Sequence, residues 1–273
     1  RALCPPTSRS DDYLRMLSEV DTYVAEGDEL ILHMMQDAGS LYFQSADATE
    51  AEVHDPTAIF PQDAISLDPG TLATSYHWQV LPPTPYDASM PPVPSGAPAH
   101  AVVTFDYTPA FAALAEGGPY IVVYPAQAYI DLWQAAGNDT IAATVESLQT
   151  LLSEQPDSPQ APLPILPPPG GRNDLAVQTA YLDFGGGNGI RFVGRISQDA
   201  SPVLNGQLAY YYQGLTNDGR FYVSMRWPMT AETLLSNMSE ISDEEQQAIN
   251  NDFEAYMQET TELLNGLVAS DWQ

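Results

Sequence analysis

The sequence predicts an α+β protein, mostly an antiparallel β-sheet with one crossing helix and C-terminal helices, preceded by a smaller β-rich segment. Three observations lead to this fold class. Two consecutive hairpin patterns fill residues 176–227, helical periodicity runs through residues 127–153, and an apolar helical stripe covers residues 243–268. Strands that follow one another through short turns pair antiparallel, whereas a parallel sheet would need a helical crossover between strands.

The N-terminal region predicts one short helix and two strands. Apolar residues at helical spacing predict a helix over residues 10–24, which Ser10 can cap. Residues 30–35 and 40–44 predict two strands joined by a turn at Asp37-Ala38-Gly39. The following stretch is acidic and irregular, and we expect a linker there.

The central region carries the first strands of the main sheet. Compact apolar or alternating runs predict strands over residues 76–81, 101–107 and 120–124. Seven prolines within residues 82–98 predict a stiff loop with polyproline character, and a second proline cluster occupies residues 155–171. Between them, residues 127–153 predict a helix with a break near Gly137-Asn138.

Two hairpins and a helix complete the chain. The first hairpin joins residues 176–184 to 190–196, and the second joins residues 207–214 to 220–227 through the Asp218-Gly219 turn. One long helix is predicted over residues 243–268. The expected organisation is a β-rich part at 1–46, a linker at 47–62, a sheet domain at 63–230 and a helical segment at 231–273.

The charge of the chain restricts its partners. With 36 acidic residues, eight arginines and no lysine, the formal net charge is −28. This field repels nucleic acid and anionic membrane surfaces, and the missing lysine excludes Schiff-base and P-loop chemistry. No apolar run approaches the roughly 18 residues of a transmembrane span. A charged fraction of 16%, abundant proline and the lack of lysine favour an extracellular or cell-envelope protein over an acidic cytoplasmic one.

Residues that could hold a cofactor or metal form no recognised motif. Gly185–Gly189 follows a predicted strand but precedes another strand, so it indicates a hairpin turn and not a nucleotide loop. The histidines, His33, His54, His77 and His100, lack the spacing of a helical zinc site. Calcium is the better metal candidate because it prefers oxygen ligands, but no calcium motif is present and we expect no cofactor. The candidate ligands are Asp68, Asp87, Asp183, Asp199, Asp218 and Glu240–Glu245.

Catalytic signals are sparse. A serine hydrolase would need Gly-x-Ser-x-Gly, which the sequence lacks. A secreted polysaccharide hydrolase needs only two facing carboxylates, so it stays an alternative. Trp78, Trp133 and Trp227 would be its sugar-stacking residues, although core positions explain these tryptophans more simply. Asn138 and Asn237 match the glycosylation acceptor pattern.

Three N-terminal runs share the features of a known family. Cys4 precedes two prolines in Arg1–Pro6, and the runs Val20–Leu32 and Gly39–Phe43 follow. Together they resemble the second half of a META (HslJ-like) domain, a small, mostly β domain of bacterial envelope proteins and lipoproteins. The resemblance implies that residues 1–46 are part of such a domain, that Cys4 pairs with a cysteine upstream of Arg1, and that a longer precursor, which could carry an upstream lipid anchor, exists. From the residues alone, Cys4 is a free thiol or a link to a partner outside the chain.

A second set of motifs spans residues 98–230. It comprises Pro98-Ala99-His100, Tyr120–Pro125 with Gln127 and Tyr129, Leu163–Pro168, Tyr181–Arg191, and the hairpin Gln213–Ser224. These motifs resemble a family of secreted bacterial proteins in which an aromatic strand, this hairpin and a glycine-rich turn recur. The family has no assigned activity, so the resemblance implies a place outside the cytoplasm and no catalytic residue.

These observations favour a non-enzymatic extracellular or cell-envelope protein of a bacterium that acts by binding or assembly. The expected partner is a protein or glycan at the cell surface, or a second copy of the chain. A subunit of a surface filament or sheath is one alternative, and a secreted polysaccharide hydrolase with paired carboxylates is the other.

Overall fold

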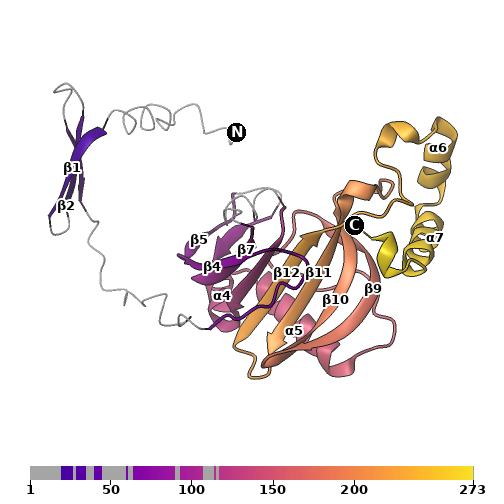
Figure 1. The fold of residues 1–273 in the computed structure, drawn as a ribbon, viewed down its shortest axis with the longest axis horizontal. Coiled ribbons are helices and arrows are strands. Elements are labelled where there is room, and N and C mark those ends of the chain that lie inside the picture. The colour runs from indigo at the N-terminus through magenta and orange to yellow at the C-terminus, as the bar shows by residue number, and fades with distance from the viewer. Residues whose placement is uncertain are drawn as a thin grey trace. The chain divides into compact units, whose positions relative to one another are not determined.

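The chain divides into two compact units, Arg1–His54 and Asp55–Gln273 (Figure 1). The computed structural model describes the backbone of residues 20–26, 29–34 and 40–44, and all atoms of residues 60, 64–89, 93–106, 114 and 117–272. The fold is α+β with mostly antiparallel sheet, as the sequence predicts. In the described part of the chain, no helix combines the length and apolar character needed to cross a membrane.

The first unit contains a three-stranded antiparallel sheet. Its strands, in the order β1-β2-β3, are Val20–Glu26, Glu29–Met34 and Ser40–Gln44. The second and third strands are those that the sequence predicts. The helix predicted over residues 10–24 is wrong from Val20 onward, because the β-branched and aromatic run Val20–Val24 pairs with β2 instead. Residues 10–19 and Cys4 lie outside the described residues.

The second unit contains a seven-stranded sheet in the order β4-β7-β8-β12-β11-β10-β9, with every neighbouring pair antiparallel. In that order the strands are Tyr76–Leu81, His100–Phe105, Tyr120–Pro125, Phe221–Pro228, Leu208–Thr216, Gly187–Ser197 and Arg172–Phe184. Both predicted hairpins are confirmed as β9–β10 and β11–β12. The glycine-rich segment is therefore a hairpin turn, as expected.

Two helices, α4 (Ala126–Gln134) and α5 (Thr140–Glu154), cover one face of this sheet (Figure 1). The predicted break between them is confirmed at Gly137, which has a φ of +77° that favours glycine. Alternate side chains of the sheet are buried against the helices, which contribute their own apolar faces. The buried residues of this core include Val122, Ile190, Phe192, Tyr211, Tyr222, Ile141, Val145 and Leu148.

The loop expected at residues 82–98 is partly ordered into a hairpin. The strands β5 (Thr84–Asp87) and β6 (Ser95–Ala97) form a separate two-stranded sheet. The prediction of a loop alone was therefore wrong. The paired positions, Thr84 with Ala97 and Asp87 with Ser95, are not prolines, so their backbones can pair, whereas proline itself donates no ladder hydrogen bond.

The opposite face of the sheet is partly covered by the C-terminal helices. The single helix predicted over residues 243–268 is wrong, because the chain breaks at Asp252 into α6 (Asp243–Asn251) and α7 (Phe253–Asn265). The Asp252 side chain accepts a hydrogen bond from the Ala255 amide and so caps α7. Short 3₁₀ helices span Asn205–Gln207, Met238–Glu240 and Ala269–Asp271.

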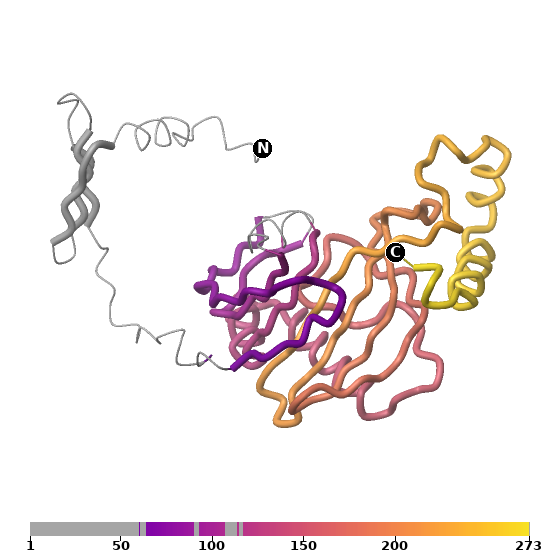
Figure 2. The backbone as a smooth tube through the Cα atoms, in the orientation of Figure 1, coloured from indigo at the N-terminus to yellow at the C-terminus, as the bar shows by residue number. Residues whose placement is uncertain are grey.

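Gln178 ties α7 to the edge strand β9. Its side-chain amide donates to the carbonyl oxygens of Leu264, Asn265 and Leu267 at 3.0–3.1 Å. Because the last carbonyls of a helix lack partners within the helix, this amide closes the end of α7. Farther along the same face, the segment after residue 63 crosses in front of β12 and β11 (Figure 2).

Candidate functional site

A row of aromatic rings runs from β7 to α4 on the helix-covered face. Tyr124 lies near the end of β8, and Pro125 leads directly into α4, which presents Tyr129 and Trp133 on one face, four residues apart. The Tyr124 ring centroid lies 5.0 Å from that of His100 and 4.7 Å from that of Tyr129, which lies 6.2 Å from Trp133. All four aromatic side chains are buried, so packing fixes their orientation.

The β5–β6 hairpin forms a wall beside Trp133. The indole nitrogen of Trp133 donates to the Gly96 carbonyl oxygen at 3.0 Å, and the Tyr86 ring meets Trp133 edge-on at 5.2 Å. Gly96 has a φ of +128°, and a Cβ there would lie 2.7 Å from Tyr86 Cα. Asn138 donates to the Tyr86 hydroxyl at 3.0 Å. Glycine at position 96 is thus required for β6 to lie this close to β5.

The second proline cluster forms the other wall, and two buried amides hold it in place. The Gln213 side-chain oxygen accepts hydrogen bonds from the Leu166 amide at 3.1 Å and the Tyr222 hydroxyl at 2.8 Å. The Asn173 side-chain oxygen accepts from the Leu163 amide at 2.9 Å. Because Gln213 and Asn173 lie on strands of the sheet, the proline segment is fixed relative to the sheet and to α4.

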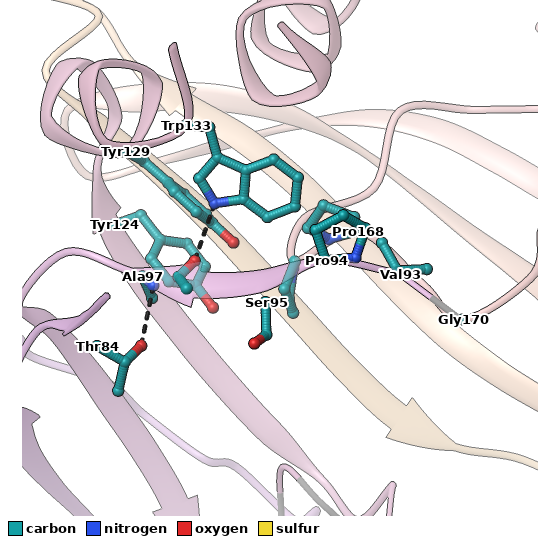
Figure 3. A pocket seen from close by; sticks show the side chains of 12 residues that line it. Thr84, Val93, Pro94, Ser95, Ala97, Tyr124, Tyr129, Trp133, Pro168 and Gly170 are labelled. Carbon is teal, nitrogen blue, oxygen red and sulfur yellow. Dashed lines mark hydrogen bonds between the residues drawn. The ribbon is translucent and has the colours of Figure 1, made fainter. Parts of the chain in front are cut away.

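A cavity of about 310 Å³ lies between these walls, and we name it the aromatic pocket (Figure 3). Figure 3 shows the hydroxyls of Tyr124 and Tyr129 pointing into the space below Trp133. The two side chains are only 3% and 2% exposed, yet neither hydroxyl oxygen is among the wholly buried, unpaired side-chain atoms of the described residues, and both are open to the cavity. The lining residues, none of which is charged, are Thr84, Val93, Pro94, Ser95, Gly96, Ala97, Tyr124, Tyr129, Trp133, Pro167, Pro168 and Gly170.

The aromatic pocket is electrically neutral at physiological pH. Burial raises the pKa of the Tyr124 phenol well above its usual value near 10, and it raises the pKa of Tyr129 as well. On the same face, burial raises the pKa of Tyr120 to about 12. Both pocket phenols therefore keep their protons and can donate a hydrogen bond to a ligand.

The two pocket hydroxyls should contribute nothing to folding stability. We expect Tyr124→Phe and Tyr129→Phe to change the free energy of unfolding by less than about 0.5 kcal/mol. Tyr222→Phe is the matched control, because its hydroxyl donates to Gln213, and it should cost about 0.5–1.5 kcal/mol. Denaturation followed by tryptophan fluorescence measures this, since all tryptophans lie in the unit Asp55–Gln273. Equal destabilisation by the three substitutions would contradict the assignment.

His100 should make stability depend on pH. Burial lowers the pKa of His100, and its Nδ1 contact with the Pro98 oxygen at 2.7 Å only partly opposes this shift. The unfolded chain therefore binds the proton at higher pH than the folded chain does. The stability contributed by neutral His100 is complete above about pH 6.5 and is lost as the pH falls below that value.

The comparison with His100→Gln isolates this effect from the titration of the many carboxylates. Between pH 7 and pH 5, the natural chain should lose more unfolding free energy than His100→Gln does. Identical slopes for the natural chain and His100→Gln would refute the prediction.

The structure does not bring the candidate metal ligands together. Asp87 bonds to Ser89, Asp218 to Thr216, and Glu245 to Ser242, each within its own turn or helix cap. Hydrogen bonding to Ser89 lowers the pKa of Asp87 below its usual value. Among the described residues, no group of three or more His, Cys, Asp or Glu side chains could hold a metal ion.

The other candidate residues occupy separate places. Trp133 is a core residue, whereas Trp78 and Trp227 are half-buried on the opposite face of the sheet. Asn138 is half-buried and already bonded to Tyr86, and Asn237 is exposed. The side chains of His33 and His54 lie outside the described residues. Among the described residues that line the aromatic pocket there is no carboxylate.

A second hollow lies on the opposite face of the sheet, and we name it the open-face groove. It encloses about 500 Å³, and Trp227 there meets Phe105 edge-on at 5.0 Å. Asp68 is its one charged lining residue among those described. The lining residues are Leu67, Asp68, Pro69, Leu72, Phe105, Ile121, Tyr210, Met225, Trp227, Met229 and Trp272.

Comparisons with protein-family models, curated proteins and solved structures found no match for the chain. The resemblances to a META domain and to secreted bacterial proteins therefore stay predictions. Segments that carry the second resemblance nevertheless meet at one place. His100, Tyr124 and Tyr129 form the aromatic row, and Pro167 and Pro168 close the aromatic pocket beside it.

Proposed function

We propose that the chain is a non-enzymatic protein of the bacterial cell envelope or extracellular space that acts by binding, with the aromatic pocket as its ligand site. One observation carries this proposal: the phenol hydroxyls of two largely buried tyrosines point into a preformed cavity with aromatic and apolar walls. Ligand sites typically combine such walls with a few polar groups that face the cavity.

The composition of the lining supports binding over catalysis. The described lining of the aromatic pocket includes no carboxylate, histidine, cysteine or arginine, and its phenols stay protonated. Such a lining offers hydrogen-bond donors and apolar rings but no group that would exchange a proton near neutral pH. The proposed location depends on the lysine-free, acidic composition and on the resemblances to envelope proteins.

A screen of uncharged compounds tests the proposal. The full chain is heated with each compound, and a rise in melting temperature identifies binding, because a ligand stabilises the state that binds it. Ser95→Trp adds a bulky ring at an exposed residue of the pocket lining and should abolish the rise. Gln149→Trp, on the exposed side of α5, is the matched control and should keep it. If no compound gives a rise in melting temperature that Ser95→Trp abolishes and Gln149→Trp keeps, the proposal fails.

Self-association is the second candidate, since the open-face groove exposes apolar side chains. Leu72 within it is 60% exposed. The net charge of −28 opposes the approach of two copies, so an assembly through this groove should form only when salt screens the charge. Light scattering across a salt series would show this. A monomer at every salt concentration would exclude the filament or sheath subunit.

A further inference from the structure

We infer that the aromatic pocket takes a prolyl residue from an extended, proline-rich peptide of a partner protein. This inference rests on the proposed function, because it names the ligand class of the same site. Three features of the pocket carry it: its size, its hydrogen-bonding groups and the shape of its apolar walls.

The size of the pocket fits a prolyl ring together with its adjoining peptide groups, because a cavity of about 150 Å³ already holds a single ring such as benzene. Its volume of about 310 Å³ lies at the lower end of the range of about 300–1,000 Å³ found for ligand sites. The prolyl ring and the carbonyl groups next to it can therefore enter together, and the rest of the peptide lies at the mouth beside Ser95, which is exposed.

The hydrogen-bonding groups of the pocket match a prolyl amide. Proline presents a carbonyl acceptor but no N–H donor. Tyr124 and Tyr129 provide two protonated phenol donors, and the indole N–H of Trp133 is already bonded to Gly96. A prolyl residue would therefore satisfy both free donors through neighbouring carbonyl groups without burying an unpaired donor of its own.

A sugar ring fits this lining less well. A pyranose carries several hydroxyls, each of which loses water on entering the pocket and needs a partner. Besides the two tyrosines, the side-chain oxygens of the lining belong to Thr84 and Ser95, and the Thr84 hydroxyl already accepts from the Ala97 amide at 3.0 Å. Several sugar hydroxyls would stay unpaired.

The walls suit a small apolar ring. Trp133 and the two tyrosines contribute aromatic surfaces on one side, and Pro94 and Pro168 contribute apolar edges on the other (Figure 3). Proline-rich peptides bind in aromatic-lined grooves because their polyproline II conformation exists before binding and little entropy is lost. The rigid pocket, with its walls fixed by Gly96 and Gln213, matches such a preformed ligand.

Calorimetric titration of the full chain with a peptide of consecutive prolines flanked by glycines tests the inference. We expect binding that is at least tenfold weaker when alanines replace the prolines. Tyr124→Phe and Tyr129→Phe should each weaken it by about five- to tenfold, the effect of one lost hydrogen bond. Ser95→Trp should abolish it. Tyr181→Phe removes a hydroxyl outside the pocket lining and should leave the affinity unchanged.

Two other outcomes separate the inference from the proposed function. If a neutral disaccharide or an apolar ring compound binds with dependence on both tyrosines, and the proline peptide does not, the prolyl ligand is wrong and the ligand site stands. If the proline peptide binds equally to the natural chain and to both phenylalanine variants, it binds elsewhere and the inference is refuted. If the pocket variants change the binding of neither the peptide nor any other uncharged ligand, both proposals fail.

Discussion

Trp133→Ala is expected to lower the free energy of unfolding of the second unit by about 3–5 kcal/mol, the range for truncating a large buried aromatic side chain. Trp133 is 1% exposed and contacts Tyr86 and Tyr129 edge-on. Its loss also leaves the Gly96 carbonyl oxygen without its indole donor. Because α4 and the β5–β6 hairpin meet through this side chain, the hairpin wall of the aromatic pocket should loosen from α4.

Two control variants separate the ring from the hydrogen bond. Trp133→Phe keeps most of the apolar volume but removes the donor, so it should cost about 1–3 kcal/mol. Trp78→Ala, at a half-buried position on the edge strand β4, should cost less than Trp133→Ala. Guanidinium denaturation followed by the remaining tryptophans measures all three. A Trp133→Ala variant within about 1 kcal/mol of the natural chain would show that Trp133 does not hold these elements together.

The sheet could be predicted because local signals sufficed for it. Strand β4 has the predicted bounds, and the second hairpin differs from the prediction by one or two residues at each end. In both cases an alternating or aromatic run of residues predicts the strand, and turn-forming residues next to the run mark where the strand ends. The errors occurred where two patterns competed. Val20–Glu26 satisfied helical spacing, but its side chains are those of a strand, and Asp252 interrupts a continuous apolar stripe by capping the next helix.

The aromatic pocket could not be predicted as a site, although several of its residues could be singled out. The contacts that build it join distant parts of the chain: Trp133 to Gly96 across 37 positions, and Gln213 to Leu166 across 47. No local periodicity reports such contacts. The one available signal was Gln213 itself, a polar residue at a position where the strand alternation predicts a core side chain, since buried polar side chains ordinarily have specific partners.

The second large effect should arise at Arg195, on the opposite face of the sheet from the aromatic pocket. Its side chain is fully buried and forms a bidentate ion pair with Asp174, with Nε donating to one carboxylate oxygen at 3.1 Å. Nη1 donates to the carbonyl oxygens of Ser201 and Pro202 at 2.8 and 2.9 Å. The guanidinium thus joins β9, β10 and the loop that follows β10.

The loop that follows β10 also contacts α7. The Val203 amide donates to the Tyr256 hydroxyl at 2.8 Å, and Val203 is buried with Leu264 in the same apolar cluster. We therefore expect Arg195→Met to destabilise the unit by about 3–5 kcal/mol, because it leaves a carboxylate and two carbonyl oxygens without their partner. Arg195→Lys should recover only part of this loss, since an ammonium cannot reproduce the planar fork of a guanidinium.

A matched variant separates the loss of the Arg195 contacts from the loss of one positive charge. Arg172→Met makes the same change in net charge at an exposed position of β9 and should stay within about 0.5 kcal/mol of the natural chain. The double variant Arg195→Met/Asp174→Leu removes both charges and should be more stable than the sum of the single effects predicts, by about 0.5–3 kcal/mol. Strict additivity in urea denaturation would mean that Arg195 acts through the Ser201 and Pro202 carbonyls alone. If Arg195→Met lowers the free energy of unfolding no more than Arg172→Met does, the Arg195 contacts do not hold the loop and α7 against the sheet.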